Sequence, residues 1–245
     1  HGPEGGASEP FLAKALADGY RDKIHLATKL PSWLVETRAD LDQFFEAQLE
    51  RLATDRIEFY LLHSINHRRW ENLCNLGVLE WLQQLKKEGR IRFFGFSFHA
   101  DLPLFKTIVD AFDWDFCQIQ LNYLDTNFQA GLNGLHYAAE RDLGIVIMEP
   151  LRGGQLVQNI PSAVREEFAP HRTPAEWALH WVWSHTDVGI ALSGMSTLEQ
   201  VQANIEYVKS FERTPFTAQD MWVIDRAVDI FHEKIKVECT GCGYC

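Results

Sequence analysis

The chain has 245 residues, of which 46% are hydrophobic, and this is enough to bury a large core in one main domain. Its formal net charge of −11 argues against nucleic acid or an anionic membrane as the main partner, because both bind clusters of lysine and arginine. No apolar run has the length of a membrane span, and the N-terminus lacks the charged-then-apolar plan of a signal peptide, so we expect a soluble, cytoplasmic protein.

Short apolar runs alternate along the chain with stretches of helical periodicity. A helix is expected first, with Ser8 as its N-cap, a proline in its first turn and an end at Asp18-Gly19. Six βα units follow it at a spacing of roughly 30 residues, which βαβ crossovers require. The six strands are predicted at 24–30, 58–64, 91–97, 116–121, 145–149 and 188–193.

Helices between and after these strands are predicted from apolar periodicity and from capping residues. Asp101, Thr173 and Thr217 each stand where a helix would begin. The stretch Ser196-Thr-Leu-Glu199 has the spacing of a capping box. The expected helices lie near 38–53, 76–88, 130–143, from 174 onward, from 196 onward and from 217 to about 236, and a further one follows Asp101 and Pro103 and carries Leu104, Phe105, Ile108 and Val109.

Two architectures fit alternating strands and helices of this kind. A doubly wound dinucleotide fold should show the pattern G-x-G-x-x-G after its first strand, and here that strand leads into Pro31-Ser-Trp33 instead. A (β/α)8 barrel needs eight strands, so two would be absent ahead of His1. A helix that precedes the first strand fits an N-terminal truncation. We therefore predict an α/β fold of the (β/α)8 TIM-barrel type whose first two strands are absent from this chain.

Two of the predicted strands carry an ionisable side chain near their ends. The apolar run 59–65 contains His63, and the run 24–30 contains Lys29. Parallel strands end at one edge of a sheet, so both groups are expected on the face where such enzymes hold their active sites. Lys29 either pairs with a carboxylate and tunes a neighbouring acid, or simply reaches solvent. His63 either serves a carbonyl or proton transfer, or is a satisfied core histidine. Its i, i+4 spacing to His67 would suit a helical zinc site, but the strand pattern disfavours that idea.

Six short motifs at the strand ends stand in a fixed order along the chain. They are Ala27-Thr-Lys29, Leu61-Leu-His63, Gly95-Phe-Ser97, Gln118-Ile-Gln120, Met148-Glu-Pro-Leu151 and Ser193-Gly-Met-Ser-Thr-Leu-Glu-Gln200. In this order they resemble the strand-end motifs of the aldo-keto reductase superfamily, and the match extends from Glu9 to about Asn204. The resemblance implies a (β/α)8 barrel that binds a nicotinamide cofactor in extended form without a Rossmann domain.

The resemblance also implies a catalytic set of aspartate, tyrosine, lysine and histidine, in which Lys29 and His63 occupy matching positions. In the family the tyrosine is the general acid, the lysine and aspartate tune it, and the histidine orients the carbonyl. The aspartate and tyrosine would lie on and just after the second strand, so we expect them upstream of His1 and expect this chain to be a fragment. The implied activity is reduction of aldehydes or ketones to alcohols with NADH or NADPH, although the fragment itself could be inactive.

A cofactor site is implied at the remaining strand ends. Ser97 and Gln118 can hydrogen-bond the carboxamide of nicotinamide. Free N–H groups ahead of the helix at Ser196 suit a phosphate, although a capping box without a ligand explains the same residues. Asn204 either reaches adenine or is a solvated helix residue. The implied set is Ser97, Gln118, Met148, Pro150, Leu151, Gly194, Ser196, Gln200 and Asn204.

Three positions in this set depart from the family pattern. Met148 takes the place of a stacking tyrosine, so contact with the nicotinamide ring is expected to be less well defined. Gly194 and Gln200 take the places of a lysine and an arginine that many NADPH-specific members use for the 2′-phosphate. Loss of both cations weakens recognition of that phosphate, so NADH or the use of both cofactors is expected.

Three cysteines close the chain with the spacing C-x2-C-x2-C, namely Cys239, Cys242 and Cys245. This is the start of the bacterial ferredoxin pattern, whose fourth ligand would follow within a few residues in a longer chain. It also resembles the C-terminal segment of a subgroup of aldo-keto reductase-like proteins with a 4Fe-4S motif. We expect residues 1–236 to form the barrel and residues 237–245 to begin a cluster segment, with zinc or idle thiols as alternatives.

Three functional hypotheses follow from these patterns. The first is a reductase of small carbonyl substrates, and the second is a nicotinamide-binding redox sensor or regulatory subunit with little turnover. The third is an electron-transfer protein that reaches a redox partner through the tail cluster. Trp33 and Trp70 each follow a strand end and could line the substrate pocket, whereas the tryptophans at 177, 181 and 183 are expected to pack in the core.

Overall fold

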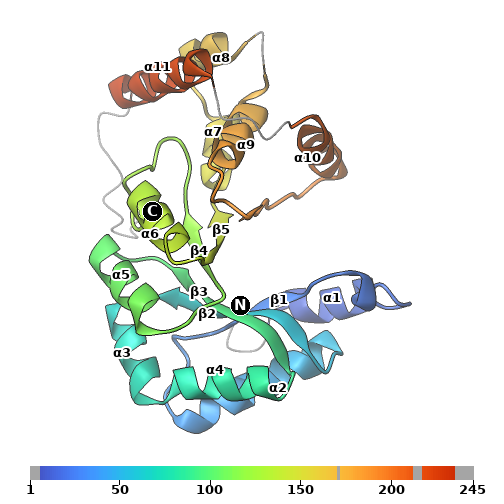
Figure 1. Cartoon of the computed structure of the whole chain (residues 1–245). Helices are drawn as coiled ribbons and strands as arrows, with labels where there is room; N and C mark the ends of the chain where they lie inside the picture. The colour runs from blue at the N-terminus through green and yellow to red at the C-terminus, as the bar shows by residue number, and fades with distance from the viewer. Residues whose placement is uncertain (1–5, 170–171, 212–216, 235–245) are drawn as a thin grey trace. The chain divides into compact units, whose positions relative to one another are not determined.

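The computed structural model describes residues 6–169, 172–211 and 217–234. The strands are β1 (Ala27–Leu30), β2 (Ile57–Ile65), β3 (Ile91–Phe98), β4 (Phe116–Gln120), β5 (Gly144–Met148) and β6 (Ile190–Ala191). They follow one another in a single sheet in chain order, and Figure 1 labels β1 to β5. The pairs β1–β2, β2–β3, β3–β4 and β5–β6 are parallel. The predicted α/β class is therefore confirmed.

Helices connect these strands and follow the last one. They are α1 (Ser8–Ala15), η1 (Arg21–Lys23), α2 (Arg38–Leu52), α3 (His67–Asn75), α4 (Val78–Lys87), α5 (Leu102–Ala111), α6 (Gly131–Ala139), η2 (Arg152–Gly154), α7 (Gln155–Gln158), α8 (Ser162–Phe168), α9 (Pro174–Ser184), α10 (Leu198–Ser210) and α11 (Ala218–Lys234). In the part of the chain that the structure describes, none of these helices is both long enough and apolar enough to cross a bilayer.

The chain folds into two compact units. The first unit contains residues 1–119 and 129–145, and the second contains residues 120–128 and 146–245. Strands β1 to β3 lie wholly in the first unit, and β6 with helices α7 to α11 lies in the second. The predicted catalytic pair therefore belongs to the first unit, and most of the predicted cofactor residues belong to the second.

Each unit has its own apolar core. In the first unit, Phe45 on α2 meets the rings of Tyr60 and Trp81 edge-on, with centroids 5.1 and 6.0 Å away. In the second unit, Phe168 stacks on Trp177 at 5.4 Å. These side chains are buried, and burial of each is worth about 1.5–3 kcal/mol relative to exposure. The expectation that Trp177 packs in the core is confirmed.

Several predicted elements differ from those observed. The helix expected at 76–88 is α4 alone, and the separate helix α3 comes before it. Helix α3 begins after Asn66, whose Oδ1 accepts the N–H of Arg69 at 3.0 Å. Its sequence is mostly polar and buries only Leu73, so apolar periodicity gave no signal for it. The connection after β5 likewise contains η2, α7 and α8, which were not predicted.

The strand predicted at 24–30 starts three residues later than expected, at Ala27. Ile24 and His25 are exposed, and the N–H of Leu26 donates to the carboxylate of Glu58 at 2.8 Å, whereas a residue within a strand would donate to a carbonyl oxygen of its neighbour. The last strand is also shorter than its predicted span and is reduced to β6.

The predicted N-caps Asp101, Thr173 and Thr217 are confirmed. Each accepts the backbone N–H three residues further on, at 3.0, 3.2 and 3.1 Å. Ser8 is not an N-cap, because it is already the first helical residue of α1 and follows Ala7, which offers no side-chain oxygen.

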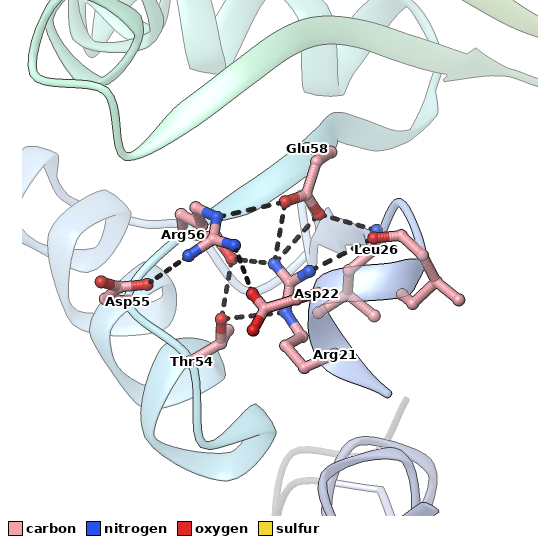
Figure 2. A network of polar contacts seen from close by, with 8 residues as sticks. Arg21, Asp22, Leu26, Thr54, Asp55, Arg56 and Glu58 are labelled. Carbon is pink, nitrogen blue, oxygen red and sulfur yellow. Dashed lines mark hydrogen bonds and ion pairs between the residues drawn. The ribbon is translucent and has the colours of Figure 1, made fainter. Parts of the chain in front are cut away.

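A polar network ties together the amino ends of β1 and β2. The guanidinium of Arg21 lies 2.9 Å from the carboxylate of Glu58 and also donates to Thr54 Oγ1 and to the carbonyl of Arg56. The same carboxylate accepts the N–H of Leu26. Figure 2 shows Arg21 and Arg56 both directed at Glu58. This end of the sheet is therefore fixed by buried charge pairing, opposite the end that carries Lys29 and His63.

Candidate active site

The carboxyl ends of β1 and β2 bring the two predicted catalytic groups together. Lys29 pairs in register with Leu61, two residues before His63. Burial lowers the pKa of His63, and the neighbouring basic residues Lys29, His99 and Arg69 lower it further, to about 4. His63 is therefore neutral at physiological pH and can donate a ring N–H to an acceptor.

Lys29 lies half-buried at the end of β1, so it does not simply extend into solvent, and burial lowers the pKa of its ammonium group. The expected carboxylate partner is not found among the described residues, because no acidic group contributes to the pKa of Lys29. Gln48 on α2 donates to the Lys29 carbonyl at 2.8 Å and accepts from the buried hydroxyl of Tyr60 at 2.8 Å. Helix α2 thus holds the strand end in place, a role that the sequence did not reveal.

An irregularity in β2 lies directly after His63. The register between β2 and β3 shifts between Leu62 and Ile65. Ser64, inside the shift, has a left-handed φ of 53°. Its N–H donates to Oγ of Ser97 on β3 at 2.9 Å. A bulge redirects side chains at a strand end, and this one is held by the buried hydroxyl of a predicted cofactor residue.

Arg69 is a site residue that the sequence patterns missed. Its Nη1 donates to the carbonyl oxygen of Ser64 at 2.6 Å and to Oγ of the same residue at 3.0 Å. Its guanidinium lies 5.7 Å from the ring centroid of Trp33. Trp33 in turn meets the ring of His63 edge-on, with centroids 5.1 Å apart. Trp33 therefore lies at the candidate site, whereas Trp70 contacts Trp114 instead.

The structure does not support a zinc site at His63 and His67. His67 is the first residue of α3, and its Nε2 lies 3.0 Å from Oδ2 of Asp101. Among the described residues, no group of three or more histidine, cysteine, aspartate or glutamate side chains could hold a metal ion. The predicted cluster ligands Cys239, Cys242 and Cys245 lie outside the described residues.

Ser97 and Gln118 are brought together by the pairing of β3 with β4. They are register partners on neighbouring strands, and both side chains are buried. The hydroxyl of Ser97 accepts from Ser64 and keeps its own proton available for donation. The pair thus brings a hydroxyl and an amide together at one point of the sheet.

The second unit contains a pocket of about 580 Å³. Its walls come from the turn after β5 and helix α7, from Ala175 on α9, from the segment after β6 and from α10 as far as Tyr207. Met148, at the end of β5, is half-buried and is not one of the lining residues. The other predicted cofactor residues of this unit line the pocket: Pro150, Leu151, Gly194, Ser196, Gln200 and Asn204.

The expected phosphate site at the start of α10 is already occupied by a side chain. The capping box is formed by Thr197 and Gln200, one residue later than the predicted pair Ser196 and Glu199. Oε1 of Gln200 accepts the N–H groups of Ser196 at 2.7 Å and of Thr197 at 3.3 Å. These N–H groups are therefore not free. Asn204 donates to Ser193 Oγ at 2.9 Å, which places its amide at the pocket wall.

The pocket is acidic. Glu149 and Glu199 line it, and no lysine, arginine or histidine does so among the residues that the structure describes. A hydrogen bond from its own backbone and one from Thr197 lower the pKa of Glu199, so its carboxylate is ionised at neutral pH. The pocket therefore favours uncharged or cationic groups near Glu199 over a further phosphate.

The turn after β5 is held by a residue outside the predicted set. Asn122 is fully buried, and its Nδ2 donates to the carbonyl of Glu149 at 3.3 Å. Its Oδ1 accepts the N–H groups of Leu124 and Asp125. Asp125 also pairs with Arg152 at 3.2 Å. Nothing in the local sequence marked Asn122, because its role depends on a contact with a turn 27 residues away.

Comparison with known proteins finds relatives named as oxidoreductases. An L-galactose dehydrogenase of Arabidopsis thaliana is 24% identical over 68% of this chain and 57% of its own length. A methylglyoxal reductase of Escherichia coli is 26% identical over 81% of this chain and 69% of its own. The chain thus spans little more than half the length of the plant relative. The structure of an aldo-keto reductase from Bacillus halodurans superposes with a TM-score of 0.75 and 26% identity, covering 89% of this chain and 76% of the other.

The family profile matches almost the full extent of the sequence. The profile described as the aldo/keto reductase family covers residues 4–229. The parallel sheet and the similar solved structure are consistent with a (β/α)8 barrel that lacks some strands. The chain belongs to the aldo/keto reductase family.

Proposed function

We propose that the whole protein is an NAD(P)H-dependent oxidoreductase that reduces small aldehydes or ketones to alcohols. The observation that carries the proposal is the half-buried Lys29 beside a neutral His63 at adjacent strand ends. Neutral His63 would donate an N–H to the carbonyl oxygen and hold it in place. The Lys29 ammonium would stabilise the ionised form of a neighbouring acid and lower its pKa. On the resemblance, that acid would be a tyrosine.

The pocket of the second unit fits the nucleotide part of the cofactor. Its walls offer the amide of Asn204 and the apolar surfaces of Pro150 and Leu151. Gly194 has open space where a side chain would stand, so a ligand can approach its backbone closely. We propose that Ser97 and Gln118 hydrogen-bond the carboxamide of the nicotinamide and that Met148 contacts its ring. When bound, the reduced nicotinamide would supply the hydride.

We propose NADH as the preferred cofactor. A 2′-phosphate needs arginine or lysine partners, and the described lining has none. The ionised Glu199 instead offers an acceptor for ribose hydroxyls and repels a phosphate. On this argument NADPH binds more weakly because its additional phosphate carries about two negative charges at pH 7.

The test titrates the full-length protein with NADH and NADPH and follows tryptophan fluorescence. NADH should bind at least about tenfold more tightly than NADPH, a difference of roughly 1.4 kcal/mol. Glu199→Lys should reduce this ratio by improving NADPH binding. The control Glu206→Lys makes the same change on the same helix, outside the pocket lining, and should leave the ratio unchanged. Equal affinities for the two cofactors in the unaltered protein would reject the preference.

Turnover is tested separately. The full-length protein should reduce small aldehydes with NADH, and Lys29→Met should lower kcat by about 100-fold or more while cofactor affinity stays within about threefold. Absence of turnover with any carbonyl compound and either cofactor would reject the proposed reaction. Tight cofactor binding without turnover would favour the redox-sensor hypothesis instead.

A second proposal concerns the C-terminal cysteines. The spacing of Cys239, Cys242 and Cys245 supports a 4Fe-4S cluster completed by a further ligand, through which electrons could reach a redox partner. Full-length protein prepared without oxygen should then be brown and contain about four irons per chain. Replacement of Cys242 by serine should remove the colour. Colourless, iron-free protein from the same preparation would reject the cluster.

A further inference from the structure

Basic side chains lie near the ring of His63 in the first unit. Lys29, His99 and Arg69 all act on its pKa in the same direction. Within the described chain, the guanidinium of Arg69 forms no ion pair with a carboxylate, and Asp101 pairs with His67 instead. Half-buried positive charge without a counter-charge is costly, so a bound anion would stabilise this end of the sheet.

Arg69 is fixed in position by the bulge after His63. Its Nη1 is used by the carbonyl oxygen and the hydroxyl of Ser64, at 2.6 and 3.0 Å. Its Nε and Nη2 form no hydrogen bond with the described residues. These two nitrogens are the edge of a guanidinium that binds the two oxygens of a carboxylate side by side.

Trp33 contacts both Arg69 and His63. Its ring lies 5.7 Å from the guanidinium carbon and 5.1 Å from the centroid of the His63 ring. Its side chain is 39% exposed, so a ligand can reach it. These two contacts leave the guanidinium carbon and the centroid of the His63 ring no more than about 11 Å apart, so one small molecule can contact both groups.

We propose that Arg69 binds a carboxylate of the substrate and that the natural substrates are short oxo acids, with an acid group a few carbon atoms from the carbonyl. The inference rests on the proposed carbonyl reduction and names its substrate class. Hydride adds to the carbonyl carbon, a proton adds to its oxygen, NADH becomes NAD+, and the product is the hydroxy acid. The carboxylate is unchanged and serves only for binding.

The test compares 4-oxobutanoate with its methyl ester, because the two share the aldehyde and the carbon chain and differ in charge. In the full-length protein, kcat/KM for the acid should exceed that for the ester by about 10- to 100-fold, the usual worth of a charged hydrogen-bonded pair. Arg69→Gln should raise KM for the acid and remove most of this preference. Arg69→Lys keeps the positive charge but lacks the paired N–H donors of the guanidinium, so it should retain an intermediate preference for the acid.

The neighbouring Arg68 provides the control. It is exposed on the same helix, and Arg68→Gln should leave the ratio of acid to ester within about twofold of the unaltered value. Thermal unfolding of each variant shows whether the fold is kept. Equal use of acid and ester by the unaltered protein would overturn the inference and leave carbonyl reduction standing. So would a loss in Arg69→Gln that is the same for both compounds, since that points to a purely structural arginine.

Binding of succinate gives a readout that does not depend on turnover. Calorimetric titration, with and without NADH, should show binding to the unaltered protein and to Arg68→Gln, and a loss of affinity of about tenfold or more in Arg69→Gln. If no carbonyl compound is reduced, the proposed reaction fails while this titration still decides the anion site. Equal succinate affinity in both arginine variants would reject it.

Discussion

The surroundings of His63 decide its protonation state. Its folded pKa of about 4 lies below the ordinary value of 6.5, because burial and neighbouring positive charges disfavour the imidazolium. Between these two pH values the unfolded chain binds a proton at His63 that the folded chain does not. The contribution of His63 to the free energy of unfolding is therefore fully present above pH 6.5. It is lost as the pH falls towards the folded value. The neutral ring that suits carbonyl binding thus makes the fold sensitive to acid.

The variant His63→Asn should therefore depend less on pH than the unaltered protein. We expect the free energy of unfolding of the unaltered chain to fall by about 1 kcal/mol more than that of the variant between pH 7 and pH 5, after allowing for solvent screening at a half-exposed group. Urea unfolding at the two pH values measures the difference. His25→Asn, at an exposed histidine, is the control. The same pH dependence in all three proteins would contradict the assignment.

The positions of individual site residues could be predicted from the sequence where the end of a strand determines them. Lys29, His63, Ser97 and Gln118 follow from apolar runs that stop at one edge of a parallel sheet, and the observed register brings the last two together. Arg69 was not predictable, because its place depends on the left-handed Ser64 and on ring contacts across the sheet edge. Local periodicity contains no information on such contacts.

At the scale of elements, Gly95 allows β3 and β4 to approach closely. A Cβ at this position would overlap the carbonyl oxygen of Phe116 and lie 2.9 Å from Cδ1 of its ring. Gly95→Ala should therefore destabilise the protein by about 3 kcal/mol, since a buried backbone cannot move aside cheaply. Chemical denaturation measures this. Gly144→Ala, whose nearest contacts would be 3.3 Å, should cost less than about 1 kcal/mol. A similar cost for both variants would show that the close approach is not the cause.

The polar network between β1 and β2 makes a second prediction at this scale. Glu58 is nearly buried, and removal of its partner leaves a carboxylate without its main counter-charge (Figure 2). Arg21→Met should lower the free energy of unfolding by about 3 kcal/mol. Arg56→Met removes a more exposed guanidinium 3.5 Å away and should cost less than about 1 kcal/mol. Urea unfolding separates these outcomes, and equal losses would assign no special role to Arg21.

Caps show why element boundaries were only partly predictable. Two capping boxes are possible at the start of α10. One begins at Ser196 and the other at Thr197, and each has a polar side chain three residues later. The fold uses the second box, in which Gln200 reaches back to two N–H groups. The choice depends on the path of the chain after β6, which the capping pattern does not contain.

At the scale of the whole molecule, β1 and β6 are the end strands of the sheet, and each has one neighbour among the described residues. Helix α10 leaves Leu198, Ile205 and Val208 exposed. Alternating strands and helices predicted this sheet, but periodicity alone does not show how its edges are covered. Strand edges without a second strand neighbour and apolar helix surface together favour association, so the chain expressed alone is expected to self-associate.

Cofactor binding should change local stability most strongly in α10. None of its described side chains is fully buried, so little apolar contact resists its opening, and its amides should exchange with solvent quickly in the free protein. The helix also lines the acidic pocket, so NADH should slow exchange there, in peptides covering 192–207, and in the facing turn at 149–158. Hydrogen exchange followed by mass spectrometry measures this with and without saturating NADH. Peptides at 54–58 serve as the reference, because the Arg21 network already holds them. Uniform slowing along the chain would indicate general stabilisation, and no slowing at 192–207 would place the cofactor elsewhere.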